Sequence, residues 1–230
     1  AAFFGSSNCH YVFDVNSAEG SKKSESRIEV EKVESVFGKS NQLVVLVPSG
    51  DYEKEKRTLS QLEKLPFVKS ALGLANQKIS DDYVLTDKLT PRQFAELTDL
   101  DVEVVQVLYS AYAYHAKQYG PVVTGIDEYG VPLIDMVLFL YDQYQEGYVT
   151  LDEDMDEMLT TLYDTLHDAQ IQLQGENYTR FVLSIEKPVE GQETYDAMEE
   201  IRGIAEQSYG KGNVLLAGNS TSAHDLETSF

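Results

Sequence analysis

The chain has 230 residues, and its content of 42% apolar and 25% charged residues is ordinary for a globular protein, which excludes general disorder. No apolar run approaches the about 18 residues that a membrane span requires. The single cysteine, Cys9, excludes an internal disulfide, and its position in a loosely patterned N-terminal stretch argues against a catalytic thiol.

The net charge of −21 is concentrated in the middle of the chain. Residues 77–176 contain 20 acidic and 4 basic side chains, so they carry 16 of the 21 net negative charges. Such a surface repels phosphates, and we therefore expect no nucleic acid as a partner. It favours a cationic ligand, although a solvated acidic face is the more ordinary interpretation.

The N-terminal part predicts a linker followed by a helix. Residues 1–22 are rich in Ser, Gly and Asn, which is typical of a linker or of a segment added for expression. From residue 26 the apolar residues recur with a period near 3.6, and Gly38 is a good helix stop. We therefore expect a helix over 26–37.

The next part predicts a β-α-β unit. Segment 41–50 contains five consecutive apolar residues, which is typical of a central strand. Segment 51–65 has acidic residues in its first turn and leucines on one face, and Pro66 ends it, as expected for a helix. A second strand is expected over 67–74.

A long insertion with helical periodicity follows. Thr90, Pro91 and Gln93 have the spacing of a capping box at the start of one helix. Two further helices are expected over 101–120 and 131–147, and a fourth begins at a second capping box. That box is formed by Thr150 and Glu153. The expected core of the insertion consists of Phe94, Val104, Leu108, Leu138, Phe139, Leu159 and Leu162.

A second β-α-β unit closes the chain, with a strand over 178–188, a helix over 190–210 and a strand over 212–218. Two such units in one chain are what a split β-α-β, or ferredoxin-like, sheet requires. Right-handed crossovers place both helices on one face of that sheet. The sequence therefore predicts an α+β fold, in which Leu43–Val47 and Phe181–Ile185 are the adjacent central strands of a four-stranded sheet.

This fold implies three parts. Residues 1–22 are the linker, residues 23–76 and 177–230 form the α+β subdomain, and residues 77–176 form a large helical insertion subdomain.

One acidic run has the spacing of a calcium loop. Asp152, Asp154 and Asp156 occupy the first ligand positions of an EF-hand. Glu157 and Tyr163 stand where that loop needs Gly and a bidentate Glu, so the start of a helix is the better interpretation.

The remaining polar residues define no catalytic or metal site. The four histidines are scattered, and none has another His or Cys at ligand spacing. Ser220, Ser222, His224 and Asp225 are neighbours in a polar turn, and no nucleophile elbow is present. We therefore expect no enzymatic activity, no metal and no cofactor.

The insertion is rich in tyrosine, which combines an apolar ring with a polar tip. One hypothesis is that Tyr109, Tyr112, Tyr114 and Phe139 line a groove between the insertion and the sheet that accepts an amphiphile. The alternative is that these rings seal the helical core.

Three stretches together resemble a known family. They are FGKSNQLVVLVP (37–48), YTRFVLSIEKPVEGQETYDAMEEIR (178–202) and LLAGNSTSAHDL (215–226). In order and spacing they resemble the extracytoplasmic loop of bacterial transporters of the RND superfamily, in the MMPL-like branch. The matching positions are Phe37, Gly38, Arg180, Pro188, Gly218, Asn219, Ser220 and Asp225.

This resemblance implies an extracytoplasmic porter domain at the bacterial cell membrane. Such a domain receives or guides a lipid, drug or other amphiphilic cargo for proton-driven export. Its expected partners are the transmembrane helices and the second extracytoplasmic loop of the same full-length transporter. The alternative function is a free-standing ligand-binding or regulatory module with a ferredoxin-like sheet, because fold alone does not fix function.

Overall fold

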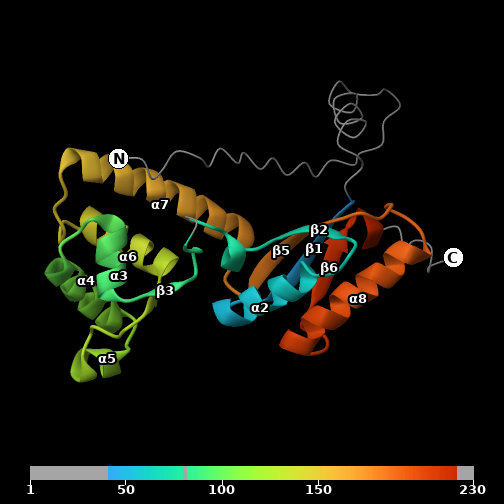
Figure 1. The fold of residues 1–230 in the computed structure, drawn as a ribbon, viewed down its shortest axis with the longest axis horizontal. Coiled ribbons are helices and arrows are strands. Elements are labelled where there is room, and N and C mark those ends of the chain that lie inside the picture. Colours follow the sequence, from blue (N-terminus) through green and yellow to red (C-terminus); the bar gives the residue numbers. More distant parts are fainter. Residues whose placement is uncertain (1–40, 80–81, 222–230) are drawn as a thin grey trace.

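The computed structural model describes residues 41–79 and 82–221. They form an elongated molecule with a sheet at one end and a group of helices at the other (Figure 1). Several predictions lie outside the described residues: the linker over 1–22, the helix over 26–37, Cys9, Phe37, Gly38, Ser222, His224 and Asp225.

Strands and helices alternate at both ends of the chain, and helices dominate its middle. The elements are β1 (Asn41–Pro48), α2 (Tyr52–Leu62), β2 (Val68–Leu72), a 3-10 turn (Leu74–Asn76), β3 (Lys88–Leu89), α3 (Pro91–Thr98), α4 (Val102–His115), α5 (Tyr119–Thr124), β4 (Val131–Pro132), α6 (Leu133–Gln145), α7 (Glu153–Leu173), β5 (Tyr178–Ile185), α8 (Gln192–Tyr209) and β6 (Leu215–Gly218).

The main sheet has four strands in the order β2-β5-β1-β6, and each neighbouring pair is antiparallel. Leu43 pairs with Leu183 and Val45 with Phe181, so the two most apolar strands are adjacent and central. This confirms the predicted α+β class and the predicted central pair. Since β5 lies between β1 and β2, and β1 between β5 and β6, the strands of each β-α-β unit run parallel to one another.

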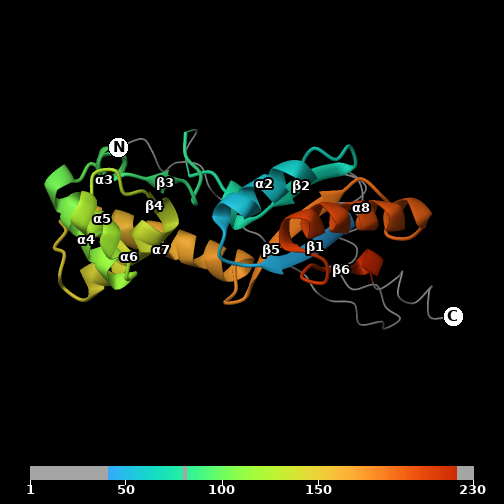
Figure 2. The ribbon, with the colours of Figure 1, turned by 90° about the horizontal axis from the view of Figure 1, so that it is seen from below.

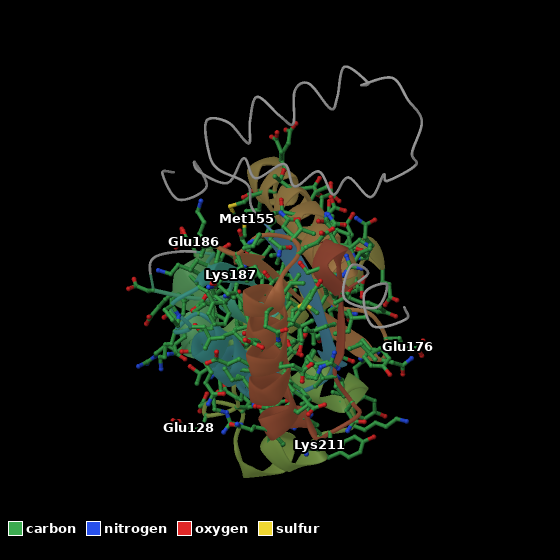
Figure 3. All side chains as sticks on the ribbon, turned by 90° about the vertical axis from the view of Figure 1, so that its right-hand side faces the viewer. Glu128, Met155, Glu176, Glu186, Lys187 and Lys211 are labelled. Atoms are coloured by element: carbon green, nitrogen blue, oxygen red, sulfur yellow. The ribbon has the colours of Figure 1, made fainter. Side chains whose placement is uncertain are left out.

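One face of this sheet is covered by both α2 and α8 (Figure 2). Alternate residues of a strand point to the same face, and the buried residues of β1 and β5 follow this rule, apart from Val182, which belongs to the opposite face. The core on this face contains Leu43, Val45, Val47, Phe181, Leu183 and Ile185 from the strands, Leu59 and Leu62 from α2, and Tyr195, Met198 and Ile201 from α8. Seen along the long axis, Lys187 and Lys211 lie on the outside near opposite ends of α8 (Figure 3).

A second core lies among α3, α4, α6 and α7. Phe94, Leu108, Phe139 and Leu159 are buried there as predicted, and Leu138 and Leu162 pack against it partly buried. The opposite face of the main sheet joins this core through Val182 on β5. The two cores are compatible with the division into subdomains, whose boundaries stay a prediction.

The predicted core position of Val104 is wrong, because 52% of this residue is exposed. Helix α4 turns Val105, Leu108 and Tyr109 inward instead. Valine is abundant in the first turns of this helix, so a stripe shifted by one residue has almost the same periodicity in the sequence.

Two predicted helix starts have different outcomes. At α3 the capping box is confirmed, since Thr90 Oγ1 accepts from the Gln93 amide and Gln93 Oε1 accepts from the Thr90 amide at 3.0 Å. The prediction that Thr150 caps α7 is wrong. The cap is Asp152, whose carboxylate accepts from the Met155 amide at 2.9 Å, and an Asp cap also places negative charge at the positive end of the helix.

The predicted helix over 101–120 is interrupted. Helix α4 ends at His115, Lys117 adopts a positive φ of 56°, and the short helix α5 begins at Tyr119. The small antiparallel pair of β3 and β4 was not predicted; it joins the start of α3 to the start of α6.

Candidate functional site

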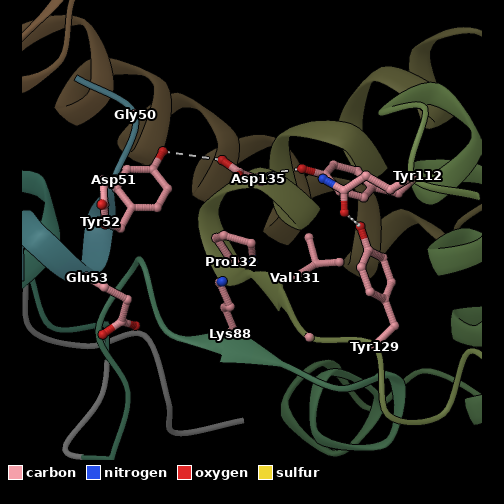
Figure 4. Close-up of a pocket in the computed structure, with 12 residues that line it drawn as sticks. Gly50, Asp51, Tyr52, Glu53, Lys88, Tyr112, Tyr129, Val131, Pro132 and Asp135 are labelled. Atoms are coloured by element: carbon pink, nitrogen blue, oxygen red, sulfur yellow. Dashed lines mark hydrogen bonds between the residues drawn. The ribbon is translucent and has the colours of Figure 1, made fainter. Parts of the chain in front are cut away.

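A pocket of about 340 Å³ lies where the sheet subdomain meets the helical insertion (Figure 4). We call it the junction pocket. Its walls come from the turn into α2 (50–53), from Lys88 on β3, from Tyr112 and Gln118, from residues 129–132, and from Asp135 on α6.

Asp135 lies at the centre of the hydrogen-bond network of this pocket (Figure 4). It belongs to the first turn of α6, where the helix dipole favours a carboxylate. The hydroxyl of Tyr52 donates to Oδ1 at 3.4 Å, and the hydroxyl of Tyr112 donates to Oδ2 at 3.5 Å. Burial raises the pKa of the Asp135 carboxyl above its ordinary value, and the two tyrosine hydroxyls oppose that rise.

Tyr52 connects the two parts of the molecule. It is the first residue of α2, which packs on the sheet, and its hydroxyl lies 3.4 Å from Asp135 on α6 and 3.3 Å from Gln174 Oε1 at the end of α7. Burial and the charge of Asp135 raise the pKa of Tyr52 well above its ordinary value, so this hydroxyl stays protonated. A single proton therefore serves two acceptors, and both contacts are weak.

Tyr129 and Gln118 form the far wall of the pocket, where the Tyr129 hydroxyl donates to Gln118 Oε1 at 2.8 Å. The Tyr129 ring also meets the ring of Tyr109 edge-on, with 6.4 Å between the centroids. This wall is therefore fixed by one short hydrogen bond and one aromatic contact.

The predicted groove residues do not line one common surface. Tyr109 is fully buried and donates to the Leu89 carbonyl at 2.9 Å, so it belongs to the core. Phe139 is also buried, with its ring 5.4 Å from that of Tyr112. Tyr114 is 70% exposed, and of these four residues only Tyr112 lines the junction pocket.

The sequence interpretation missed Tyr52, Tyr129 and Asp135. Asp135 carried a usable signal, because it is the single charged residue of the apolar stretch VPLIDMVLFLY. A lone acid in such a stretch is expected to face a polar cavity or a partner. Tyr52 had no comparable signal, since the first turn of an acidic helix is usually exposed.

A second constellation joins two positions of the family resemblance, Pro188 and Ser220. The side-chain amide of Asn41, at the start of β1, donates to Ser220 Oγ at 2.7 Å and to the Pro188 carbonyl at 2.9 Å. Ser220 is fully buried, and Asn41 is 3% exposed. This arrangement gives Ser220 a structural role, but the prediction of a polar turn is wrong at this position, because residues 219–221 are helical.

Gly218 ends β6 beside this constellation and has a φ of 153°. A Cβ atom at this position would lie 2.7 Å from the Gln42 carbonyl oxygen, so only glycine fits without a backbone shift. Asn219 follows it and is exposed, while Arg180 is half-buried on β5 opposite Leu46. Thus Pro188, Gly218 and Ser220 meet at one end of the sheet, and Arg180 does not join them.

Comparison of the chain with protein-family models, with curated proteins and with solved structures finds no match. Among the described residues, no helix is both long and apolar enough to cross a membrane.

Proposed function

We propose that this chain is the extracytoplasmic porter domain of a bacterial RND-superfamily exporter of the MMPL-like type. The proposal starts from the sequence resemblance in residues 37–48, 178–202 and 215–226. Two features of the described residues support it, the order of the strands and the arrangement of the chain at one end of the sheet.

The first support is topological. The order β2-β5-β1-β6, with both crossover helices on one face, is compatible with the split β-α-β arrangement that the resemblance implies. The helical insertion lies between β2 and β5 in the sequence, so it connects the two β-α-β units. Both units nevertheless belong to one sheet, because β2 pairs with β5.

The observation that carries the proposal is the hydrogen bond between Asn41 and Ser220. The chain enters the sheet at Asn41 and leaves it after β6 at Ser220, and these side chains are 2.7 Å apart. A loop inserted between two neighbouring membrane helices needs its two ends on the same side. A buried hydrogen bond between residues 179 positions apart supports the proposal, because it holds together the points where the described chain enters and leaves the sheet.

In this proposal the domain receives or guides an amphiphilic cargo and catalyses no reaction. Its partners are the transmembrane helices and the second extracytoplasmic loop of the full-length transporter, and the helices carry the protons that drive export. The helical insertion lies at the opposite end of the molecule from the sheet, so in this proposal it would project away from the membrane (Figure 1).

The gene on either side of the segment tests this proposal. We expect an apolar run of about 20 residues close to each end. In intact cells that produce the full-length protein, added protease should cleave within the domain, while a cytoplasmic marker stays whole. If the flanking sequence has no such runs, or if cleavage needs lysed cells, the porter proposal is wrong and a free-standing module is favoured.

A further inference from the structure

We infer that the junction pocket binds an organic ammonium group, with Asp135 as its counter-charge and tyrosines as its walls. This inference rests on the proposed function only in identifying the ligand as the head group of a cationic cargo. Binding itself is a property of the isolated chain.

The first argument is the incomplete pairing of Asp135. Strong hydrogen bonds to a carboxylate have donor–acceptor distances of about 2.5–2.7 Å, whereas the hydroxyls of Tyr52 and Tyr112 lie at 3.4 and 3.5 Å. No lysine, arginine or histidine of the described chain forms an ion pair with Asp135. A cation that enters the pocket would stabilise this carboxylate, because the carboxylate is largely buried and has only two weak hydrogen-bond donors.

The second argument is the distribution of charge. Three carboxylates line the pocket, those of Asp51, Glu53 and Asp135, against the single ammonium group of Lys88. Asp51 is partly neutralised by Lys54 at 3.6 Å, and Lys88 is exposed, so the deepest of these charges is that of Asp135. An anion would face this carboxylate directly, which disfavours phosphate and carboxylate ligands relative to a cation.

The third argument is the chemistry and size of the walls. Tyr52, Tyr112 and Tyr129 contribute aromatic rings, and such rings attract ammonium groups, which are recognised by aromatic cages in other proteins. A volume of about 340 Å³ is at the lower end of the about 300–1,000 Å³ of small-molecule sites. The pocket therefore suits a head group and the start of its chain, and the acidic insertion attracts cations towards it.

Isothermal titration of the chain with decyltrimethylammonium, below its micellar concentration, tests the inference. Sodium decyl sulfate is the matched probe with the opposite charge, and choline tests the head group without the chain. We expect saturable binding of the two cations, tighter for decyltrimethylammonium, and no such binding of decyl sulfate.

Two substitutions that each remove one negative charge distinguish binding in the pocket from general attraction to an acidic protein. Asp135→Asn should lower the affinity for decyltrimethylammonium by about tenfold or more, since it removes a partly desolvated counter-charge. Asp142→Asn changes an exposed acid of the same helix and should leave the affinity unchanged within about twofold. Circular dichroism and the midpoint of thermal unfolding establish that both variants are folded.

A third variant has the opposite expected sign. Lys88→Gln removes the one cation of the pocket wall without touching Asp135, so it should strengthen binding of the ammonium probe. The same titration in about 1 M salt should reduce weak surface attraction far more than binding in the pocket.

Three results would overturn the inference. They are the absence of saturable binding of the cation, equal loss in the Asp135→Asn and Asp142→Asn variants, and binding of decyl sulfate with similar affinity. None of them affects the porter proposal, which depends on the flanking sequence and the side of the membrane. Conversely, if the pocket binds ammonium but the gene encodes no flanking membrane helices, this inference stands and the porter proposal is refuted.

Discussion

Glu55 is a buried acid whose ionisation should destabilise the fold as the pH rises. It lies on α2 with no exposed surface; Oε1 accepts from the Thr179 hydroxyl at 2.8 Å, while Oε2 has no hydrogen-bond partner among the described residues. Burial raises the pKa of Glu55 to about 7, the Thr179 hydrogen bond opposes this rise, and the charge of Asp51 adds to it. Tyr209 of α8 is close enough for its own pKa to be raised, chiefly by burial and secondly by the charge of Glu55.

The sign of the effect follows from the direction of this pKa change. The folded chain holds its proton up to about pH 7, whereas the unfolded chain releases it near the ordinary value of 4.5. The free energy of unfolding therefore falls between these two pH values, and the full penalty is present above pH 7. A tenfold change in proton affinity corresponds to about 1.4 kcal/mol, so the penalty for Glu55 is about 3 kcal/mol.

The substitution Glu55→Gln removes this titration and keeps the shape of the side chain. Urea unfolding followed by circular dichroism at about pH 4 and about pH 8 gives the unfolding free energy of both proteins. Relative to the variant, the native chain should lose about 3 kcal/mol between these two pH values. Any constant effect of the buried amide cancels in this difference.

Glu200→Gln is the matched control, because Glu200 is an exposed acid in the middle of α8. It should leave the pH dependence of stability unchanged. If Glu55→Gln also changes this dependence by less than about 0.5 kcal/mol, the carboxyl is not held in its neutral form by burial, and the reasoning is refuted.

Two further predictions test the described packing. Gly218→Ala should destabilise the chain by about 2 kcal/mol or more in urea unfolding, because its Cβ would lie 2.7 Å from a backbone carbonyl oxygen. Gly203→Ala, in a helix with open space around the new Cβ, should be neutral or stabilising by up to about 1 kcal/mol, and equal effects would contradict the close approach at Gly218. Val107→Asp, at a residue that is 71% exposed, should change stability by about 0.5 kcal/mol or less, whereas Val105→Asp should unfold the helical core; the reverse order would show that α4 faces the other way.

Much of the sheet was predictable because the pattern of apolar residues within each strand indicates which of its faces are buried. Unbroken apolar residues in 43–47 and alternation in 178–185 identify strands that bury one or both faces. The capping box of Thr90 and Gln93 was equally local, since it joins residues three apart. Signals of this kind need no knowledge of the rest of the fold.

Features that depend on distant packing were not predictable in the same way. Tyr52 reaches Asp135 across 83 residues, and no periodicity in either segment indicates this contact. The inward face of α4 is chosen by α3 and α6, and the valines of that helix fit either register. The pair of β3 and β4 has two residues in each strand, too few for a periodic pattern.

The order of the strands also has a consequence for the time course of folding. β1 forms hydrogen bonds with β5 and β6, so Asn41, which pairs with Ile185, must wait for residues synthesised much later. Closing such a long loop is slow because its entropy is lost before the strand pairs form. The helical insertion is made largely of contacts close in sequence and can collapse first. Leu72 and Val182, which flank the insertion in the sequence, are paired in the sheet. A compact insertion therefore brings the two β-α-β units close together and shortens the time they need to find each other.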